Sequence, residues 1–196
     1  MENTKTLRHK VREAYSEAAE RPDSFHIFPV GRRFAESIGY PAHLLSSLPV
    51  TAVDAFAGVS NVSLFAEVPR GAIVLDLGCG AGLDSLVAAQ RTGSQGMVIG
   101  VDFSAPMLNR ARLSAREAQI DHVTFFRADA ESLPLRTSSV DLALVNGIFN
   151  LNPAREVIFR ELRRVVRRGG SVYAAELILS QPLSREERES EQNWFA

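Results

Sequence analysis

The sequence predicts an α/β protein: a doubly wound, mostly parallel, Rossmann-like sheet with an N-terminal helical cap. Three observations support this fold class. Short apolar runs alternate along the chain with segments of helical periodicity. The runs are apolar at most positions, as expected for strands that helices cover on both faces. A glycine-rich segment follows the first run and leads into a helical pattern, so a ligand is expected at the carboxyl ends of the strands.

Residues 1–70 are expected to form the helical cap. Over residues 5–20 apolar side chains recur at helical spacing, and Pro22 ends the predicted helix. Between 22 and 70, prolines divide an apolar stretch into short pieces. Two interpretations of this stretch stay open: a helical cap packed on the core, or a lid that helps to close the active site.

Residues 71–180 are expected to form the Rossmann-like core. Its predicted strands are the apolar runs 72–77, 97–101, 123–127, 140–146 and 171–178. Helical patterns fill most of the gaps, and right-handed crossovers between the runs give the doubly wound sheet.

The predicted helices have recognisable ends. Ser104 is a suitable N-cap, with Pro106 just inside the helix that follows it. Another helix starts after Asn152-Pro153 and is expected to stop at Gly169-Gly170. A serine–glutamate capping box predicts a last helix over 181–196.

Composition excludes several classes of protein. The 196 residues are 45% hydrophobic, which suffices for one domain with a sizeable core. The net charge of −1 creates no overall field that would attract nucleic acid or a membrane surface. The single cysteine cannot form an intramolecular disulfide, and no apolar stretch approaches the roughly 18 residues of a membrane span. We therefore expect a soluble, cytoplasmic protein.

The segment "VLDLGCGAG" is the strongest functional signal. Gly78, Gly80 and Gly82 alternate directly after an apolar run, and glycines let backbone approach a ligand closely. The next helix points its positive N-terminal end at the same place. Asp102 ends the second apolar run, twenty residues after Gly82, where such folds bind ribose hydroxyls. Together these features predict a nucleoside-containing cofactor.

The same segment discriminates between cofactors. The dinucleotide fingerprint G-x-G-x-x-G fails because Leu83 stands where its third glycine would be, which disfavours a nicotinamide-dependent oxidoreductase. A phosphate-binding loop of the Walker type would need a lysine that is missing here. Asp76 precedes the first glycine, where its carboxylate would repel a pyrophosphate but would suit an ammonium or a sulfonium.

At this point the chain resembles the class I S-adenosylmethionine-dependent methyltransferases. "VLDLGCGAG" is close to the first motif of that family and "IGVDFSAPMLNRAR" to its second. From about Gly39 to the last residue it is similar to the arsenite methyltransferase branch, in the segments "LPVTAVDAFAGVSN", "GLDSLVAAQRTG", "RADAESLPL", "LVNGIFNLNPAREVIFRELRRVVRRGG" and "NWFA". The resemblance implies S-adenosylmethionine as cofactor and a sheet of order 3-2-1-4-5. It also implies a final antiparallel hairpin, which the sequence lacks.

Cofactor-binding roles follow for individual residues. Asp76 is expected to bind the methionine moiety or to cap the loop, and Asp102 to bind both ribose hydroxyls. Phe103 and Met107 flank the adenine or pack in the core. The resemblance implies that Asp129 and the backbone N–H of Ala130 recognise the adenine edge, and that Asn146 ends the strand facing the methyl group. The predicted cofactor-binding residues are Asp76, Gly78, Cys79, Gly80, Gly82, Asp102, Phe103, Met107, Asp129, Ala130 and Asn146.

The sequence departs from the arsenite pattern at its cysteines. Members of that branch carry a cysteine where this chain has Gly147, and others that it also lacks. The sole thiol, Cys79, lies in the glycine loop and is expected to be structural. Trivalent arsenic is a soft centre that thiolates hold. Arsenite itself is therefore a disfavoured acceptor, although an arsenic–glutathione adduct needs no protein thiol.

The predicted reaction is methyl transfer to a small molecule by in-line displacement, and the alternative is a catalytically incomplete relative that only binds the cofactor. No catalytic base is assigned, because each candidate has an equally ordinary structural role.

No metal site is expected, since the histidines lack ligand spacing. Nucleic-acid binding through the basic run 163–168 is disfavoured, because a helix C-terminus explains it. A homodimer stays possible. The candidate bases are Tyr15, His26, His43, Asp54 and Glu176.

Overall fold

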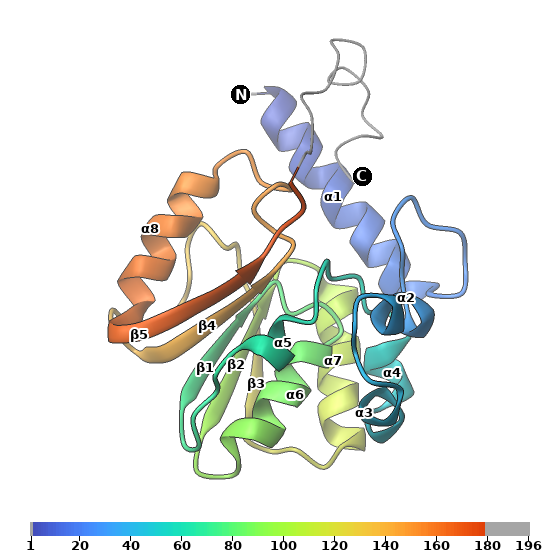
Figure 1. Ribbon diagram of the computed structural model, residues 1–196. Coiled ribbons are helices and arrows are strands. Elements are labelled where there is room, and N and C mark those ends of the chain that lie inside the picture. Colours follow the sequence, from blue (N-terminus) through green and yellow to red (C-terminus); the bar gives the residue numbers. More distant parts are fainter. Residues whose placement is uncertain (1, 179–196) are drawn as a thin grey trace.

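The computed structural model describes the backbone of residues 2–178 and the side chains from Leu7 onward. Within this range five parallel strands form one sheet. Their order, β3-β2-β1-β4-β5, is the expected one, and the first strand, β1, lies in the middle of the sheet (Figure 1). The strands are β1 (Ile73–Leu77), β2 (Met97–Asp102), β3 (Val123–Arg127), β4 (Val140–Asn146) and β5 (Val166–Ala175).

Helices cover both faces of this sheet. Helices α6 (Leu83–Thr92) and α7 (Ala105–Glu117) lie on one face, and α8 (Arg155–Val165) lies on the other (Figure 1). Side chains along a strand alternate between the two faces. Val74 accordingly packs in a cluster with residues of α6, whereas Leu75 packs in a cluster with residues of α8. Burial on both faces explains why the inner strands β1, β2 and β4 are almost continuously apolar, whereas the edge strands β3 and β5 are largely exposed.

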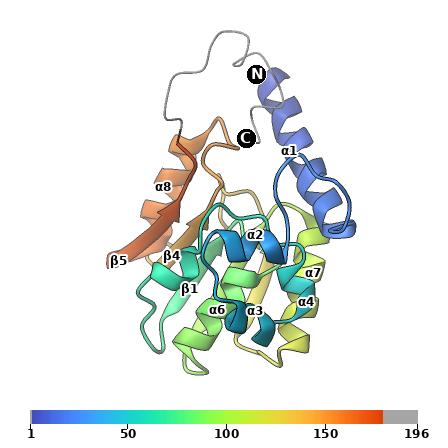
Figure 2. The same ribbon diagram turned by 45° about the vertical axis from the view of Figure 1, so that its right-hand side comes forward.

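The chain before the sheet folds into short helices and one long one. Helices α2 to α5 lie beside α6 and α7, and Tyr40, Leu45 and Phe56 from this segment join the core there (Figure 2). Helix α1 stands above the carboxyl ends of the strands in both views (Figures 1 and 2). The five helices are α1 (Glu2–Glu20), α2 (Arg32–Ser37), α3 (Ala42–Ser47), α4 (Val50–Val53) and α5 (Val62–Phe65).

Most predicted boundaries agree with the structure. Strands β3 and β4 have the predicted ends, and Ser104 caps α7 by accepting a hydrogen bond from the backbone N–H of Met107 at 3.4 Å. Within the described residues no helix combines the length and the apolar character that crossing a membrane requires. The last helix predicted over 181–196 lies outside the described residues.

The boundary between α8 and β5 was predicted wrongly. The helix ends at Val165, before Gly169-Gly170, and β5 begins at Val166, five positions before the predicted start. The register against β4 shifts between Val140 and Leu142, so β5 bulges where the two glycines lie. A bulge accommodates glycine and extra residues inside a strand. The two glycines therefore mark an irregularity within β5 and not the end of α8, as the sequence had suggested.

Candidate cofactor site

The loop between β1 and α6 folds back against the end of β2. The backbone N–H groups of Gly78 and Cys79 both donate to the carbonyl of Val101, at 2.8 and 3.0 Å. Gly78 has a φ of 78°, and a Cβ there would lie 2.5 Å from the Cγ2 atom of Ile148. This position therefore requires glycine for both its conformation and its space. The loop leads into the N-terminus of α6.

Asp102 joins this loop to the start of α7. Its carboxylate accepts a hydrogen bond from the N–H of Gly80 at 2.9 Å and another from the N–H of Ser104 at 2.8 Å. The residue is only 7% exposed. Burial raises the pKa of Asp102 to about 6, although the backbone hydrogen bonds oppose that rise. Each oxygen keeps a further lone pair for a ligand hydroxyl.

Asp76 lies beneath the loop and does not line the pocket described below. It is 1% exposed and accepts a hydrogen bond from the hydroxyl of Ser85 at 2.5 Å. Burial raises the pKa of Asp76 to about 8, and the neighbouring charge of Asp84 adds to this rise. The structure thus places this carboxylate close to the glycine loop but below its surface, and its role in binding the methionine moiety stays a prediction.

Asp84 is a pocket residue that the sequence analysis missed. It lies in the first turn of α6, is 5% exposed and lines the pocket. The hydroxyl of Tyr40 donates to Oδ1, and the amide of Asn146 donates to Oδ2 at 2.9 Å. Burial raises the pKa of Asp84. An acidic residue in a first helical turn is common, so its sequence position alone carried no distinctive signal.

Asn146 is fully engaged with its surroundings. Its Oδ1 accepts hydrogen bonds from the N–H groups of Val59 and Ser60, at 2.8 and 3.1 Å, while its amide also donates to the carbonyl of Ser60 at 2.7 Å. The side chain thus fastens the end of β4 to the loop that precedes α5 and to Asp84. It lines the pocket, and a direct contact with a cofactor stays a prediction.

A pocket opens above these groups and holds about 1030 Å³ of empty space, its mouth to solvent included. Its walls come from the ends of β1, β2 and β4, the segment after β3, helix α1 and residues 55–58. All the predicted cofactor-binding residues line it except Asp76 and Gly82. The predicted residues that line the pocket are Gly78, Cys79, Gly80, Asp102, Phe103, Met107, Asp129, Ala130 and Asn146.

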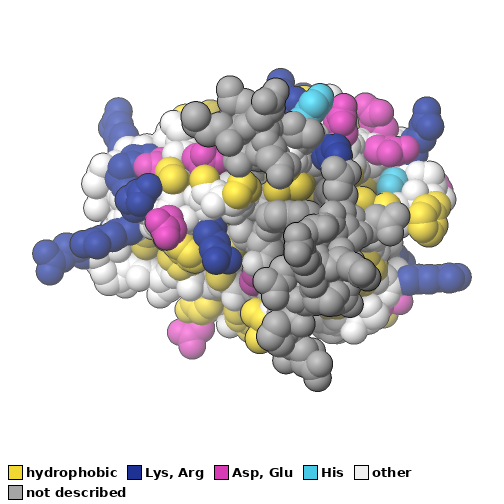
Figure 3. All heavy atoms as spheres, turned by 90° about the horizontal axis from the view of Figure 1, so that it is seen from above, with side chains coloured by type: hydrophobic (Ala, Val, Ile, Leu, Met, Phe, Trp, Pro, Cys, Tyr) yellow, Lys and Arg dark blue, Asp and Glu magenta, His cyan; other side chains and the backbone are white. Residues whose placement is uncertain are grey.

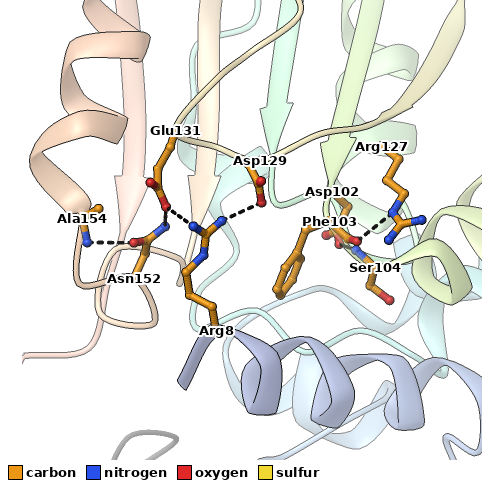
Figure 4. Close-up of polar contacts among 9 residues, drawn as sticks. All are labelled: Arg8, Asp102, Phe103, Ser104, Arg127, Asp129, Glu131, Asn152 and Ala154. Atoms are coloured by element: carbon orange, nitrogen blue, oxygen red, sulfur yellow. Dashed lines mark hydrogen bonds and ion pairs between the residues drawn. The ribbon is translucent and has the colours of Figure 1, made fainter. Parts of the chain in front are cut away.

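Helix α1 closes one side of this pocket. Arg8, Val11 and Tyr15 line it, and the spacing of these residues places them on one helical face. The guanidinium of Arg8 pairs with Asp129 at 2.7 Å and with Glu131 at 3.0 Å (Figure 4). Sequence periodicity identified this helix but could not identify its partners, because they lie more than a hundred residues away.

The candidate bases differ in whether they line the pocket. Tyr15 lines the pocket, and burial raises the pKa of its hydroxyl above the ordinary value, so it stays protonated at neutral pH. Glu176 accepts hydrogen bonds from the N–H groups of Phe149 and Asn150, and it is not a lining residue. His26, His43 and Asp54 are likewise not lining residues. A protonated phenol donates a hydrogen bond and cannot accept a proton from an acceptor molecule.

Cys79 lines the pocket but is nearly buried, and burial raises the pKa of its thiol well above the ordinary value. A thiol that stays protonated is a poor nucleophile and a poor ligand for soft centres. Among residues 2–178, no group of three histidine, cysteine, aspartate or glutamate side chains could hold a metal ion.

The basic run 163–168 is divided between two elements. Arg164 lies in the last turn of α8 and pairs with Glu161 at 2.6 Å, whereas Arg167 lies in β5 and pairs with Asp141 at 2.5 Å. The helix C-terminus therefore accounts for only part of the run. On the face drawn in Figure 3, basic side chains (dark blue) lie around the rim with acidic side chains (magenta) among them. The expectation that the chain binds no nucleic acid stays a prediction.

Comparison with known proteins agrees with this geometry. The family model described as "Methyltransferase domain" matches residues 69–195. An arsenite methyltransferase from Halobacterium salinarum is 34% identical over 148 residues, which are 76% of this chain and 38% of that protein. A demethylmenaquinone methyltransferase from Listeria welshimeri is 34% identical over 107 residues, which are 54% of this chain and 45% of that protein. The chain thus spans less than half the length of these relatives.

Similar solved structures agree with this family. An arsenic(III) S-adenosylmethionine methyltransferase from Chlamydomonas reinhardtii superimposes with a TM-score of 0.64 at 27% identity, over 86% of this chain and 57% of that one. A phosphoethanolamine N-methyltransferase from Haemonchus contortus, with a TM-score of 0.63 at 19% identity over 88% of this chain and 33% of that one, shares the fold. The chain belongs to the methyltransferase domain family, in its class I, S-adenosylmethionine-dependent branch, and is related to the arsenite methyltransferases.

Proposed function

We propose that this chain binds S-adenosylmethionine in the pocket above the glycine loop and transfers the methyl group to a small-molecule acceptor by in-line displacement. The observation that carries the proposal is a group of buried acidic side chains without a cationic partner. Three buried carboxyl groups surround the loop, those of Asp76, Asp84 and Asp102, and burial raises the pKa of each. Among the described side chains, no ion pair joins any of the three to a lysine, arginine or histidine.

Buried charges are costly unless a partner compensates them. Here the partners are neutral donors: a serine and a tyrosine hydroxyl, an amide and two backbone N–H groups. The pocket therefore favours a ligand that supplies positive charge. S-adenosylmethionine has an ammonium and a sulfonium, whereas a dinucleotide would bring a pyrophosphate into the same negative field.

The shape of the loop also fits this cofactor. A Cβ added at Gly80 would meet only the Sδ atom of Met107, at 3.8 Å, so any side chain at Gly80 would occupy the pocket. Asp102 lies at the end of β2 with lone pairs for a ribose diol. Asp84 faces the pocket at the other end of the loop, so we assign the ammonium of the methionine moiety to Asp84 in preference to Asp76.

When bound, the cofactor supplies a methyl group on a positively charged sulfur. The protein's own task is then alignment and exclusion of water. Holding two reactants in line contributes about 7–11 kcal/mol toward lowering a barrier. Phe103 and Met107 would flank the base, and residues of α1 and of the segment 55–58 would cover the reacting atoms. The acidic residues that line the pocket, Asp84, Asp102 and Asp129, are assigned to the cofactor, and Tyr15, the candidate base among the described lining residues, stays protonated. This assignment favours an acceptor that is nucleophilic at neutral pH without a base.

Calorimetry with S-adenosylhomocysteine tests the cofactor. We expect micromolar binding to the wild-type chain and at least about 100-fold weaker binding to Asp102→Ala, since two charge-assisted hydrogen bonds to the ribose are lost. Asp121→Ala is the matched control, because the Asp121 side chain is fully exposed on the loop before β3 and lies outside the pocket. Absence of heat with the wild-type chain would refute the proposal.

The catalytic half of the proposal needs a separate measurement. Incubation with radiolabelled S-adenosylmethionine and a panel of thiol, arsenite–glutathione and quinol acceptors should label at least one of them. Binding without any transfer would instead support the alternative of a cofactor-binding relative that is catalytically incomplete.

A further inference from the structure

The N-terminal half of α1 reaches over the pocket, and the other half anchors it. Ala18 and Ala19 are buried near α7, and the hydroxyl of Ser16 lies 2.9 Å from that of Ser104. Arg110 of α7 donates to the carbonyl of Ala19. The helix is thus fixed beside the residues that hold Asp102, and its free end extends across the mouth of the pocket.

At that free end, Arg8 bridges two carboxylates of the segment after β3. Its Nη2 atom lies 2.7 Å from Oδ1 of Asp129, and its Nη1 atom lies 3.0 Å from Oε1 of Glu131 (Figure 4). Glu131 also accepts a hydrogen bond from the amide of Asn152 at 3.0 Å, and Asn152 in turn accepts one from the N–H of Ala154 at 2.8 Å. Arg8 therefore ties α1 to the segments that follow β3 and β4.

This bridge leaves half of the Asp129 carboxylate open. The bond from Arg8 uses Oδ1, and no hydrogen bond between described residues uses Oδ2. Asp129 lines the pocket although its side chain is 55% exposed. A carboxylate so exposed turns freely in water unless something fixes it. The guanidinium of Arg8 is planar and donates from Nη1 to Glu131 and from Nη2 to Asp129, so it fixes the orientation of the Asp129 carboxylate.

We propose that Arg8 is a specificity-determining residue, which positions Asp129 so that its free oxygen reads the exocyclic amino group of the bound purine. The inference rests on the proposed function, because it takes S-adenosylmethionine as the ligand. An adenine presents an N–H donor to that oxygen. A hypoxanthine presents a carbonyl oxygen at the same position, which a carboxylate repels. Because Arg8 lies on α1, the position of this helix over the pocket and recognition of the base are coupled.

The test compares two ligands that differ at this one group, S-adenosylhomocysteine and S-inosylhomocysteine. Their dissociation constants are measured by calorimetry for the wild-type chain and for Arg8→Ala. The pair is partly exposed and adds little to folding, so the variant should fold normally. Arg12→Ala is the matched control, because Arg12 lies on the same helix, is exposed and does not line the pocket.

We expect the wild-type chain to prefer the adenine ligand by at least about tenfold, since a site built to receive an N–H rejects an analogue that lacks it. Arg8→Ala should weaken binding of the adenine ligand by about fivefold and leave the hypoxanthine ligand nearly unchanged, so the preference falls. Arg12→Ala should preserve both constants. In an Asp129→Ala background, removal of Arg8 should have no further effect on the preference.

Three results would overturn the inference. Equal weakening of both ligands by Arg8→Ala would mean that the arginine only holds the helix. Unchanged dissociation constants for both ligands would mean that Arg8 does not position Asp129. In both cases the wild-type chain still binds S-adenosylhomocysteine, and the proposed function stands. If the wild-type chain binds neither ligand, the proposed function fails and the inference fails with it.

Discussion

The floor and the mouth of the pocket are built in opposite ways. On the floor, Asp76, Asp84 and Asp102 are at most 7% exposed, and neutral hydroxyl, amide and backbone donors hold them. At the mouth, the side chains of Arg8 and Asp129 are 33% and 55% exposed, and they hold each other as an ion pair. The floor gathers acidic groups without a cationic partner, whereas at the mouth one guanidinium pairs with the two carboxylates of Asp129 and Glu131.

This difference separates binding strength from control of access. Buried charges interact strongly with a ligand because the local dielectric is low and water is excluded. An exposed ion pair is worth about 0–1 kcal/mol, so it forms and breaks readily. We therefore expect the floor to provide most of the affinity for a cationic ligand, and the mouth to provide closure and choice between bases.

The largest effect is expected from neutralising the floor. Asp84→Asn keeps the size of the side chain and one acceptor oxygen, which can receive the amide of Asn146, while its NH2 group can donate to the Tyr40 hydroxyl. The substitution removes the charge that we assign to the ligand ammonium. We expect affinity for S-adenosylhomocysteine to fall by about 30-fold, within the range for hydrogen bonds to charged groups. Thermal stability of the ligand-free chain should rise, because a buried carboxylate without a cation is costly.

These two changes have opposite signs, which distinguishes a binding role from a structural one. A variant that loses both affinity and stability would show that Asp84 merely supports the fold. Asp76→Asn is the comparison on the same floor. Because Asp76 does not line the pocket, it should gain stability with a smaller loss of affinity. A larger loss at Asp76 than at Asp84 would contradict our assignment of the ammonium.

A smaller effect is expected from pH. The pKa of Asp102 is about 6 in the folded chain, above its ordinary value, because of burial. The folded state then binds the proton more tightly than the unfolded state, so stability of the ligand-free chain decreases as pH rises from about 4 to about 6. Binding of a ribose diol favours the ionised carboxylate. Affinity for S-adenosylhomocysteine should therefore increase by about tenfold between about pH 5 and pH 7, as the ionised fraction grows.

Calorimetry and thermal unfolding across this range check the two opposite trends. Asp102→Asn should flatten the affinity profile, since the amide does not titrate. If affinity stays constant from pH 5 to 7 in the wild-type chain, Asp102 does not bind the ribose in its ionised form.

The floor was more predictable than the mouth, for a physical reason. Asp76, Gly78 and Asp102 belong to one strand–loop–helix–strand unit, so their spacing in sequence fixes their spacing in the fold. The strand order came from the resemblance to the methyltransferase family, because no local pattern shows that β4 pairs with β1. Asp84 was missed although it lies in that unit, because its distinguishing feature is burial between Tyr40 and Asn146, which no local pattern encodes.

The mouth depends on contacts between segments far apart in the chain. Arg8 and Asp129 are 121 residues apart, and both are ordinary charged residues in exposed surroundings. Helical periodicity predicted the α1 helix, but it could not show that Arg8, Val11 and Tyr15 face a pocket. Prediction of strand β5 was limited in a similar way. Its early start depends on pairing with β4 across a bulge, whereas the local sequence Gly169-Gly170 alone indicates the end of a helix.

The smallest effect is expected from salt, and it separates the two regions most directly. Exposed ion pairs are screened when the Debye length falls from about 10 Å at 0.1 M salt toward about 3 Å at 1 M, while buried groups are screened much less. Raising potassium chloride from 0.1 to 1 M should therefore weaken binding of S-adenosylhomocysteine by about two- to threefold in the wild-type chain. In Arg8→Ala the mouth has no pair to screen, so its affinity should change less over the same range. An equal salt dependence in both proteins would assign the screening to the floor, and it would remove the distinction between a buried, prebuilt floor and a mouth that an ion pair closes.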